Sequence, residues 1–139
     1  MKTGSGTILA LDVGEVRIGV AMANLASRLP QPWGVIEHPS NAADIINSLL
    51  KEHNIVAVVV GLPRGLDGQE TSQTKLVRTF TDKLKPKLHL PFYFQDEALT
   101  SVQAEKELKQ RKIKYNKGDV DALAATYILS DFLSEHREF

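Results

Sequence analysis

The sequence predicts one α/β domain in which a mixed β-sheet is flanked by helices. Three β-type runs come first, separated only by a turn and a proline-containing connector, which favours an antiparallel set. Segments with the period of amphipathic helices then alternate with further β-type runs, which favours helix-linked parallel strands. The 139 residues suit a single domain over 1–139, because this length can bury one core and no linker, repeat or low-complexity segment divides it.

The first three strands are expected to form the antiparallel set. The runs TILALDV (7–13) and RIGVAMA (17–23) are apolar, and Gly14 between them can take positive φ in a tight turn at little steric cost. These two runs therefore predict a β-hairpin. The run WGVIEH (33–38) follows a connector that contains Pro30 and Pro32, and it is expected to add a third strand to the same set.

Helices and strands alternate in the rest of the chain. Apolar residues recur with helical spacing in two segments, 41–53 and 71–85. The residues Thr100 to Gln103 indicate a capping box that opens a third helix, and Gly118 and Asp119 open a fourth. Two β-type runs separate the first three helices. The run IVAVVVGLP is apolar on both sides, as in a parallel strand covered by helices on both faces. Pro86 is expected to end the second helix. Helices are therefore expected at 41–53, 71–85, 100–112 and 118–135, and strands at 55–63 and 90–95.

Acidic residues stand at the ends of three predicted elements. Asp12 closes the first strand, and Asp96 and Glu97 follow the strand LPFYF. Asp119 and Asp121 lie in the first turn of the last helix. If the first, fourth and fifth strands are neighbours, these ends converge. Structural alternatives are a turn residue at Asp12, an exposed charge at Glu97 and a helix cap at Asp119; we interpret Asp119 as the cap, which leaves Asp121 as a functional candidate.

Three converging carboxylates in a chain without cysteine indicate a site for a hard divalent cation. Oxygen ligands suit Mg²⁺ or Mn²⁺, and two such ions about 3.5–4 Å apart serve phosphodiester cleavage. The four histidines show no ligand spacing and are interpreted as structural. The residue types therefore favour a nuclease that uses two ions.

Positive charge is local rather than global. Seventeen basic and 17 acidic residues give a net charge of zero, so no overall field attracts nucleic acid or a membrane. The window KQRKIKYNK (109–117) has no acidic residue and places an aromatic ring among cations, as in surfaces that bind single strands; a solvated helix end is the alternative.

The loop GLPRGLDG (61–68) lacks the Gly-Lys-Ser/Thr of a P-loop, and is either a plain connection or a flap that carries Arg64 to a phosphate. The nucleic-acid candidates in these segments are Arg64, Lys109, Arg111, Lys112, Lys114, Tyr115 and Lys117.

Four blocks of the sequence resemble the YqgF family, also called RuvX. The blocks are LALDVGEVRIGVA, VVVGLPRGLDG, FQDEALTSVQAE and NKGDVDALAATYIL. They match the family in order and spacing over nearly the whole chain. Each block alone is weakly specific, but four in register are specific. The resemblance implies an RNase H-like fold, a five-stranded mixed β-sheet whose first three strands are antiparallel and which helices flank.

The resemblance also implies the site residues. The family's acidic positions fall on Asp12, Glu97 and Asp121, with Asp96 as an auxiliary ligand. The family usually has an arginine after the DE pair, where this chain has Ala98. The candidates to replace that arginine are Arg17, Arg64 and Arg111. The related actin-like ATPases share the first hairpin motif but need two such domains, and this chain has one.

The function expected from this resemblance is a Mg²⁺- or Mn²⁺-dependent endonuclease that processes the 5′ end of pre-16S rRNA. One alternative is Holliday junction resolution, which ordinarily needs a homodimer to make two symmetric cuts, whereas a monomer suffices for trimming RNA. Another is a non-catalytic RNA-binding factor in ribosome assembly. The N-terminus shows no secretory or membrane segment, so a cytoplasmic protein without a membrane partner is expected.

Overall fold

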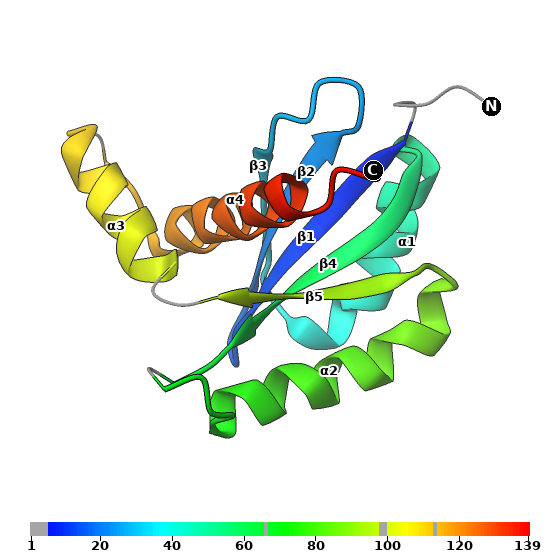
Figure 1. Ribbon diagram of the computed structural model, residues 1–139, viewed down its shortest axis with the longest axis horizontal. Helices are drawn as coiled ribbons and strands as arrows, with labels where there is room; N and C mark the ends of the chain where they lie inside the picture. Colours follow the sequence, from blue (N-terminus) through cyan, green and yellow to red (C-terminus); the bar gives the residue numbers. More distant parts are fainter. Residues whose placement is uncertain (1–5, 66, 98–99, 113) are drawn as a thin grey trace.

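The fold is a five-stranded mixed β-sheet with helices on both faces (Figure 1). It was obtained as a computed structural model, which describes residues 6–65, 67–97, 100–112 and 114–139. The strand order is β3-β2-β1-β4-β5; β1, β2 and β3 are antiparallel, and β4 and β5 run parallel to β1. The expected architecture is therefore confirmed, including the adjacency of the first, fourth and fifth strands. The strands are β1 (Thr7–Val13), β2 (Ile18–Asn24), β3 (Gln31–Ile36), β4 (Ile55–Pro63) and β5 (Phe92–Glu97).

The helices divide between the two faces of the sheet. One face is covered by α1 and α2, and the other by α4, against which α3 packs (Figure 1). A short 3₁₀ turn, η1, leads into α1. No helix in the described ranges is both long and apolar enough to cross a bilayer. The helices are η1 (Pro39–Asn41), α1 (Ala42–Glu52), α2 (Ser72–Leu88), α3 (Thr100–Gln110) and α4 (Lys117–Glu135).

The sheet has a hydrophobic core on each of its faces, and alternate side chains of each strand point into one core or the other. On β1, Leu9 and Leu11 pack with residues of α1 and α2, whereas Ile8 and Ala10 pack with residues of α4. Successive side chains of a strand point to opposite faces, so the next residue on the α4 face is Asp12. A charged residue thus continues an otherwise apolar row.

Two local expectations were wrong. Helix α2 passes through Pro86 and ends at Leu88, because a proline in the last turn removes only one backbone hydrogen bond; the acceptor lost, the Asp82 carbonyl, belongs to an exposed residue. Gly14 does not have positive φ; among the described glycines only Gly34 and Gly68 do. A Cβ on Gly14 would instead lie 3.0 Å from the Arg17 carbonyl oxygen, so this glycine provides space in the turn.

The start of the last helix also differs from the expectation. Asn116 is the N-cap, and its side chain accepts a hydrogen bond of 2.9 Å from the Asp119 amide. Asp119 is the third helical residue, and its carboxylate accepts a hydrogen bond of 3.0 Å from the Asn116 amide. The two residues form a capping box, so Asp119 has a structural role from inside the helix rather than as its cap.

Candidate active site

Asp12 lies one residue from the end of the central strand, on the face that α4 covers. Its partner on β2 is Gly19, and the preceding residue, Leu11, pairs with Val20 on one side and Val60 on the other. The backbone is thus paired with β2 at Asp12 itself and with strands on both sides at Leu11. The side chain is only partly exposed, next to an apolar row.

The glycine opposite Asp12 brings α4 onto the sheet. A Cβ on Gly19 would lie 2.9 Å from the Ala122 nitrogen and closer still to the Asp121 carbonyl group. Real Cβ atoms do not approach backbone this closely, so the helix can rest on the strand only because position 19 has no side chain. Through this contact the second turn of α4 places Asp121 beside Asp12.

A second strand glycine admits Glu97. A Cβ on Gly61 would lie 3.0 Å from both Cδ and Oε1 of Glu97, and closer than that to Cδ1 of Ile128. Gly61 follows Val60, the β4 partner of Leu11 on β1. The Glu97 carboxylate, which starts from β5, therefore lies over β4 on the way to Asp12.

Glu97 and Asp121 both lie close enough to Asp12 to repel its negative charge. Burial and repulsion from Glu97 and Asp121 together raise the pKa of Asp12 from 3.8 to about 8, and burial is the largest of these causes. Burial also raises the pKa of Asp121, although its hydrogen bond with Arg17 opposes that change. The convergence that the sequence predicted for Asp12, Glu97 and Asp121 is thus present in the fold.

Arg17 provides the positive charge nearest to this acidic cluster. Its Nε donates a hydrogen bond to Oδ2 of Asp121, and both side chains are about three-quarters buried. Gln73 of α2 donates through Nε2 to the Val13 carbonyl oxygen at 3.4 Å. These groups surround a cavity of about 330 Å³. Its lining residues are Asp12, Val13, Gly14, Glu15, Val16, Arg17, Gln73, Lys117 and Asp121.

The cluster fits a divalent cation in donor type and charge. Carboxylate oxygens are the ligands that Mg²⁺ and Mn²⁺ prefer, and three acids in a partly buried site leave negative charge that a cation would neutralise. The arrangement is not that of a formed metal site, since the described residues contain no group of three or more His, Asp or Glu side chains in ligand positions. Asp121 pairs with the Arg17 guanidinium, which occupies the position that a metal ion would need at this carboxylate.

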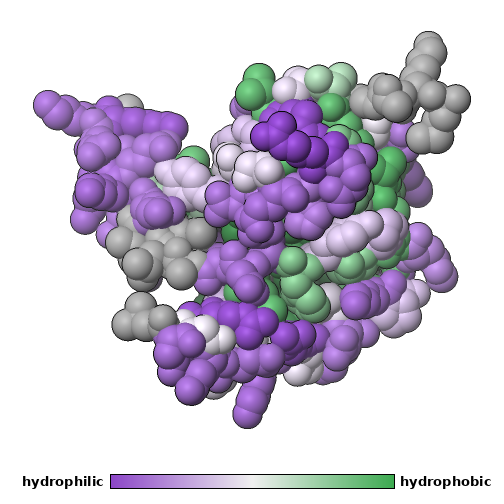
Figure 2. All heavy atoms as spheres, viewed as in Figure 1, coloured by the Kyte–Doolittle hydropathy of each residue, from purple (hydrophilic) through white to green (hydrophobic). Residues whose placement is uncertain are grey.

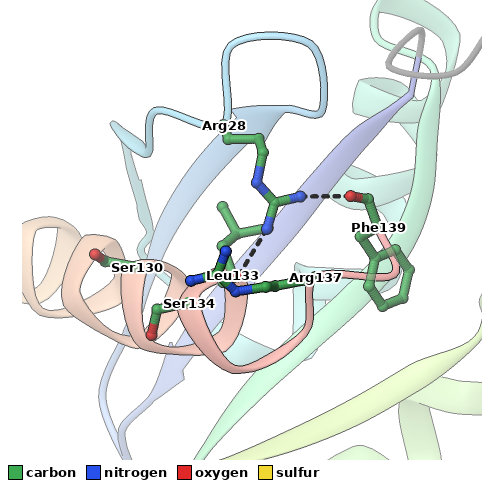
Figure 3. A pocket seen from close by; sticks show the side chains of 6 residues that line it. All are labelled: Arg28, Ser130, Leu133, Ser134, Arg137 and Phe139. Carbon is green, nitrogen blue, oxygen red and sulfur yellow. Dashed lines mark hydrogen bonds between the residues drawn. The ribbon is translucent and has the colours of Figure 1, made fainter.

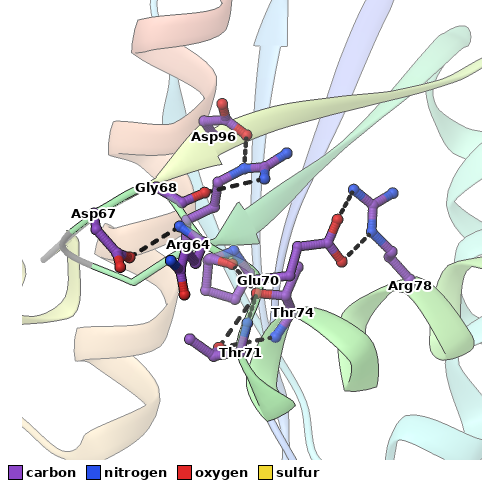
Figure 4. A network of polar contacts seen from close by, with 10 residues as sticks. Arg64, Asp67, Gly68, Glu70, Thr71, Thr74, Arg78 and Asp96 are labelled. Carbon is purple, nitrogen blue, oxygen red and sulfur yellow. Dashed lines mark hydrogen bonds and ion pairs between the residues drawn. The ribbon is translucent and has the colours of Figure 1, made fainter.

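Asp96 is not brought into the cluster. Adjacent residues of a strand point to opposite faces, and Asp96 therefore faces away from Glu97, on the side of α2. There its Oδ1 accepts a hydrogen bond of 3.0 Å from Nε of Arg64, and Arg64 also donates to the Gly68 carbonyl oxygen at 3.3 Å (Figure 4). Arg64 is thus held between β5 and its own loop. Ala98 lies outside the described residues.

The basic window covers the end of α3 and the connection to α4. Lys109 pairs with Glu105 at 3.4 Å, and Arg111 pairs with Glu107. Figure 2 shows a largely hydrophilic surface over α3. Among the described residues, no ion pair involves the remaining lysines of the window, which are Lys112, Lys114 and Lys117.

A larger cavity, of about 490 Å³, lies at the opposite end of α4 (Figure 3). Arg28 donates there to the carbonyl oxygens of Leu133, at 2.7 Å, and of Phe139. A cation at the C-terminal end of a helix satisfies carbonyl groups that lack intrahelical partners. Arg28 therefore caps the helix, and the cavity is separated from the carboxylates by most of the length of α4.

Gly19 and Gly61 shape the site, yet sequence analysis did not select them. A glycine inside a strand pattern often marks a close backbone approach, so the signal was present. What approaches each glycine depends on packing between distant segments. The sequence therefore shows where a close contact occurs but not which helix or side chain makes it.

Comparisons with known proteins place the chain among nucleases. It matches the RuvX family, described as Holliday junction resolvase, over residues 6–135. Proteins named "Putative pre-16S rRNA nuclease" from Roseiflexus sp. (strain RS-1) and Crocosphaera subtropica are 39% and 42% identical to it, over 99% and 93% of this chain and 100% and 93% of theirs.

Solved structures resemble the fold. T. thermophilus RuvC in complex with Holliday junction substrate has a TM-score of 0.54 at 15% identity, covering 94% of this chain and 95% of that one. A structure of RuvC from Thermus thermophilus has the same TM-score at 12% identity and covers 94% of this chain and 96% of its own. This likeness confirms the RNase H-like fold.

Proposed function

Because this chain belongs to the RuvX family, we propose that it is a metal-dependent endonuclease that processes the 5′ end of pre-16S rRNA. It is a phosphodiester-cleaving hydrolase that acts on nucleic acid, as its family and its relatives' names indicate. The choice of pre-16S rRNA as substrate follows the names of relatives that align with this chain over nearly their full length. Such processing belongs to ribosome assembly, and a cytoplasmic location is part of the proposal.

The observation that carries the proposal is the convergence of Asp12, Glu97 and Asp121. Partial burial of three acids in one place costs free energy, and such a cost is typical of functional sites. The pKa of Asp12 is raised because ionising this carboxyl group in a partly buried site beside two other acids costs free energy. The same three positions are those that the family resemblance assigned as acidic.

Asp12, Glu97 and Asp121 would hold Mg²⁺ or Mn²⁺, as one ion or as a pair. A divalent ion bound there supplies charge that makes a water more acidic and stabilises the leaving oxygen. Asp12 is on the central strand and directly follows Leu11, which pairs with strands on both sides. It is therefore assigned as the central ligand, with Glu97 and Asp121 on either side.

Arg17 and Lys117 are assigned to the substrate phosphate. Both line the cavity that contains Asp12 and Asp121, and Lys117 is the first residue of α4, at the positive end of the helix. A guanidinium presents several donors in the geometry that phosphate oxygens accept. An ion held at Asp121 would compete with Arg17 for that carboxylate, and the Arg17 guanidinium would then be able to bind a phosphate.

Cleavage of two substrates side by side tests the proposal. Highly purified protein is incubated with a labelled pre-16S 5′ leader RNA and with a four-way DNA junction, each with Mn²⁺, Mg²⁺ or EDTA. The proposal expects cation-dependent cutting of the RNA. Cutting of the junction alone, by a dimer, would replace it with the resolvase function named by the family description. RNA binding that persists in EDTA, with no cutting under any condition, would indicate the non-catalytic factor.

A further inference from the structure

We propose that a pocket between β3, α3 and α4 receives one unpaired nucleobase of the substrate strand. The inference rests on the proposed function, because it assumes that a nucleic-acid strand occupies the neighbouring active site. It adds a substrate class: a strand with at least one unstacked nucleotide close to the bond that is cut.

The pocket has an apolar floor and an aromatic wall. It measures about 230 Å³, below the roughly 300–1,000 Å³ of sites for drug-sized ligands, and so suits one ring system. Leu108, Ala122 and Leu123 are buried and form the floor. Pro32 of β3 is exposed on one side, and the partly buried Tyr115 is on another. These surfaces suit the faces of a flat aromatic group.

The rim of the pocket carries the charges that a nucleic-acid backbone requires. Arg111 and Lys114 are exposed beside the opening. Asp119 also lines the pocket, but one of its oxygens already accepts the Asn116 amide in the capping box. Aromatic rings beside basic side chains are the usual elements of single-strand binding surfaces.

Contacts between the helices fix the walls. The Tyr127 hydroxyl of α4 donates a hydrogen bond of 2.6 Å to Oε1 of Glu107 on α3, whose Oε2 pairs with Arg111. Tyr115 packs on the small core that contains Leu108 and Leu123. The pocket is therefore formed before any ligand binds.

The pocket and the active site lie on two sides of the same helix start. Lys117 and Asp121 line the catalytic cavity, whereas Asp119, Ala122 and Leu123 line the pocket. A strand whose phosphate lies at Lys117 thus passes the first turns of α4, and the base of a neighbouring nucleotide can turn into the pocket. A base inside a continuous duplex is stacked and cannot do so without being extruded.

Stacking in this pocket tolerates every base, since each has a π-face. The expected substrate is therefore defined by an unpaired position and not by sequence. Removing the stacking ring should weaken binding about tenfold, within the range known for base–aromatic stacking.

The test measures binding in EDTA, where no cutting occurs. Fluorescence anisotropy follows the wild type, Tyr115→Phe, Tyr115→Ala and Tyr115→Leu with a short single-stranded RNA and with the same RNA made abasic at every position. The measured quantity is the ratio of the affinity for intact RNA to the affinity for abasic RNA. This ratio should be about tenfold larger for the wild type and Tyr115→Phe than for Tyr115→Ala and Tyr115→Leu. Equal preference in all four proteins would overturn the proposal. Tyr115→Leu keeps an apolar side chain on the core, so the result does not depend on the alanine variant folding.

A charge-matched pair gives a second, independent reading. Lys114→Glu alters the rim, whereas Lys106→Glu makes the same change at an exposed position of α3 that does not line the pocket. The rim variant should lose several-fold more affinity for the single strand than the control, and equal losses would contradict the assignment. Because neither assay depends on cleavage, a protein that binds as expected but does not cut would refute the nuclease function alone.

Discussion

The Asp121 backbone rests on Gly19, the cross-strand partner of Asp12, at a distance that no side chain at position 19 would permit. This contact positions the helix that carries the third carboxylate. Gly19 has no side chain, and its small size thus determines whether the acidic cluster can form.

Replacing the two strand glycines should have different effects on stability. Gly19→Ala forces a Cβ against helix backbone, which cannot move without shifting α4, so we expect a loss of about 3 kcal/mol. Gly61→Ala meets the ends of the Ile128 and Glu97 side chains, which can turn away, so a loss of about 1 kcal/mol is expected. Urea unfolding measures both. Equal losses would show that the helix does not depend on close contact at position 19.

Asp12→Asn should stabilise the ion-free protein at alkaline pH. The folded-state pKa of about 8 lies above the ordinary 3.8, so the folded protein retains a proton that the unfolded chain releases. The contribution of Asp12 to the free energy of unfolding is therefore largest below about pH 4 and is lost as the pH rises toward 8. At pH 8 the variant should melt roughly 3–10 °C higher, which corresponds to about 1–3 kcal/mol.

The same comparison at acid pH is the control. Near pH 4 most Asp12 carboxyls in the folded state are protonated, so the two proteins should melt at nearly the same temperature. A stabilisation that does not change between pH 4 and pH 8 would mean that the carboxylate charge is not its cause.

Arg17→Ala should strengthen binding of Mn²⁺. The guanidinium now pairs with Asp121 and must leave before an ion can use that carboxylate, so its removal should raise affinity about 3- to 10-fold. Isothermal titration calorimetry measures the affinity without any nucleic acid. Arg64→Ala is the matched control, since Arg64 pairs with Asp96 on the other face of the sheet and its removal should change nothing. Unchanged affinity in Arg17→Ala would show that Asp121 is not a ligand.

Lysines without acidic partners should contribute most to binding of the nucleic-acid phosphate backbone. Lys112→Gln should lower the slope of log K against log salt by about 0.7, the value for one phosphate contact on a single strand. Lys109→Gln, which removes a lysine paired with Glu105, should lower it less. Anisotropy titrations at several salt concentrations measure both slopes, and equal slopes would mean that the ion pair does not matter.

Local patterns were sufficient to predict which strands and helices form, although β3 begins at Gln31, two residues before the expected start, and includes Pro32. The apolar run of β1 and the helical spacing of α1 depend on nearby residues, and both elements lie where the sequence placed them. The end of α2 was misplaced because the penalty of a proline depends on where it stands in the helix, and Pro86 is in the last turn.

The candidate site depended on contacts that are distant in sequence. The acids could be proposed from element ends, but the pairing of Arg17 with Asp121 joins residues 104 positions apart and has no local signal. Likewise, Asp96 and Glu97 are adjacent in sequence and differ only in the face to which they point. Only the register of β5 separates the residue in the cluster from the one outside it.

Cleavage of a pre-16S 5′ leader by variants of the acidic residues tests the central claim most directly. With Mn²⁺ present, Asp12→Asn, Glu97→Gln and Asp121→Asn should each reduce the rate by at least about 100-fold, because each removes a charge from the ligand set. Asp96→Asn, next to Glu97 but on the opposite face, should cut at nearly the wild-type rate. Full activity in Asp12→Asn, or a loss in Asp96→Asn as large as that in Glu97→Gln, would contradict the assignment of the site.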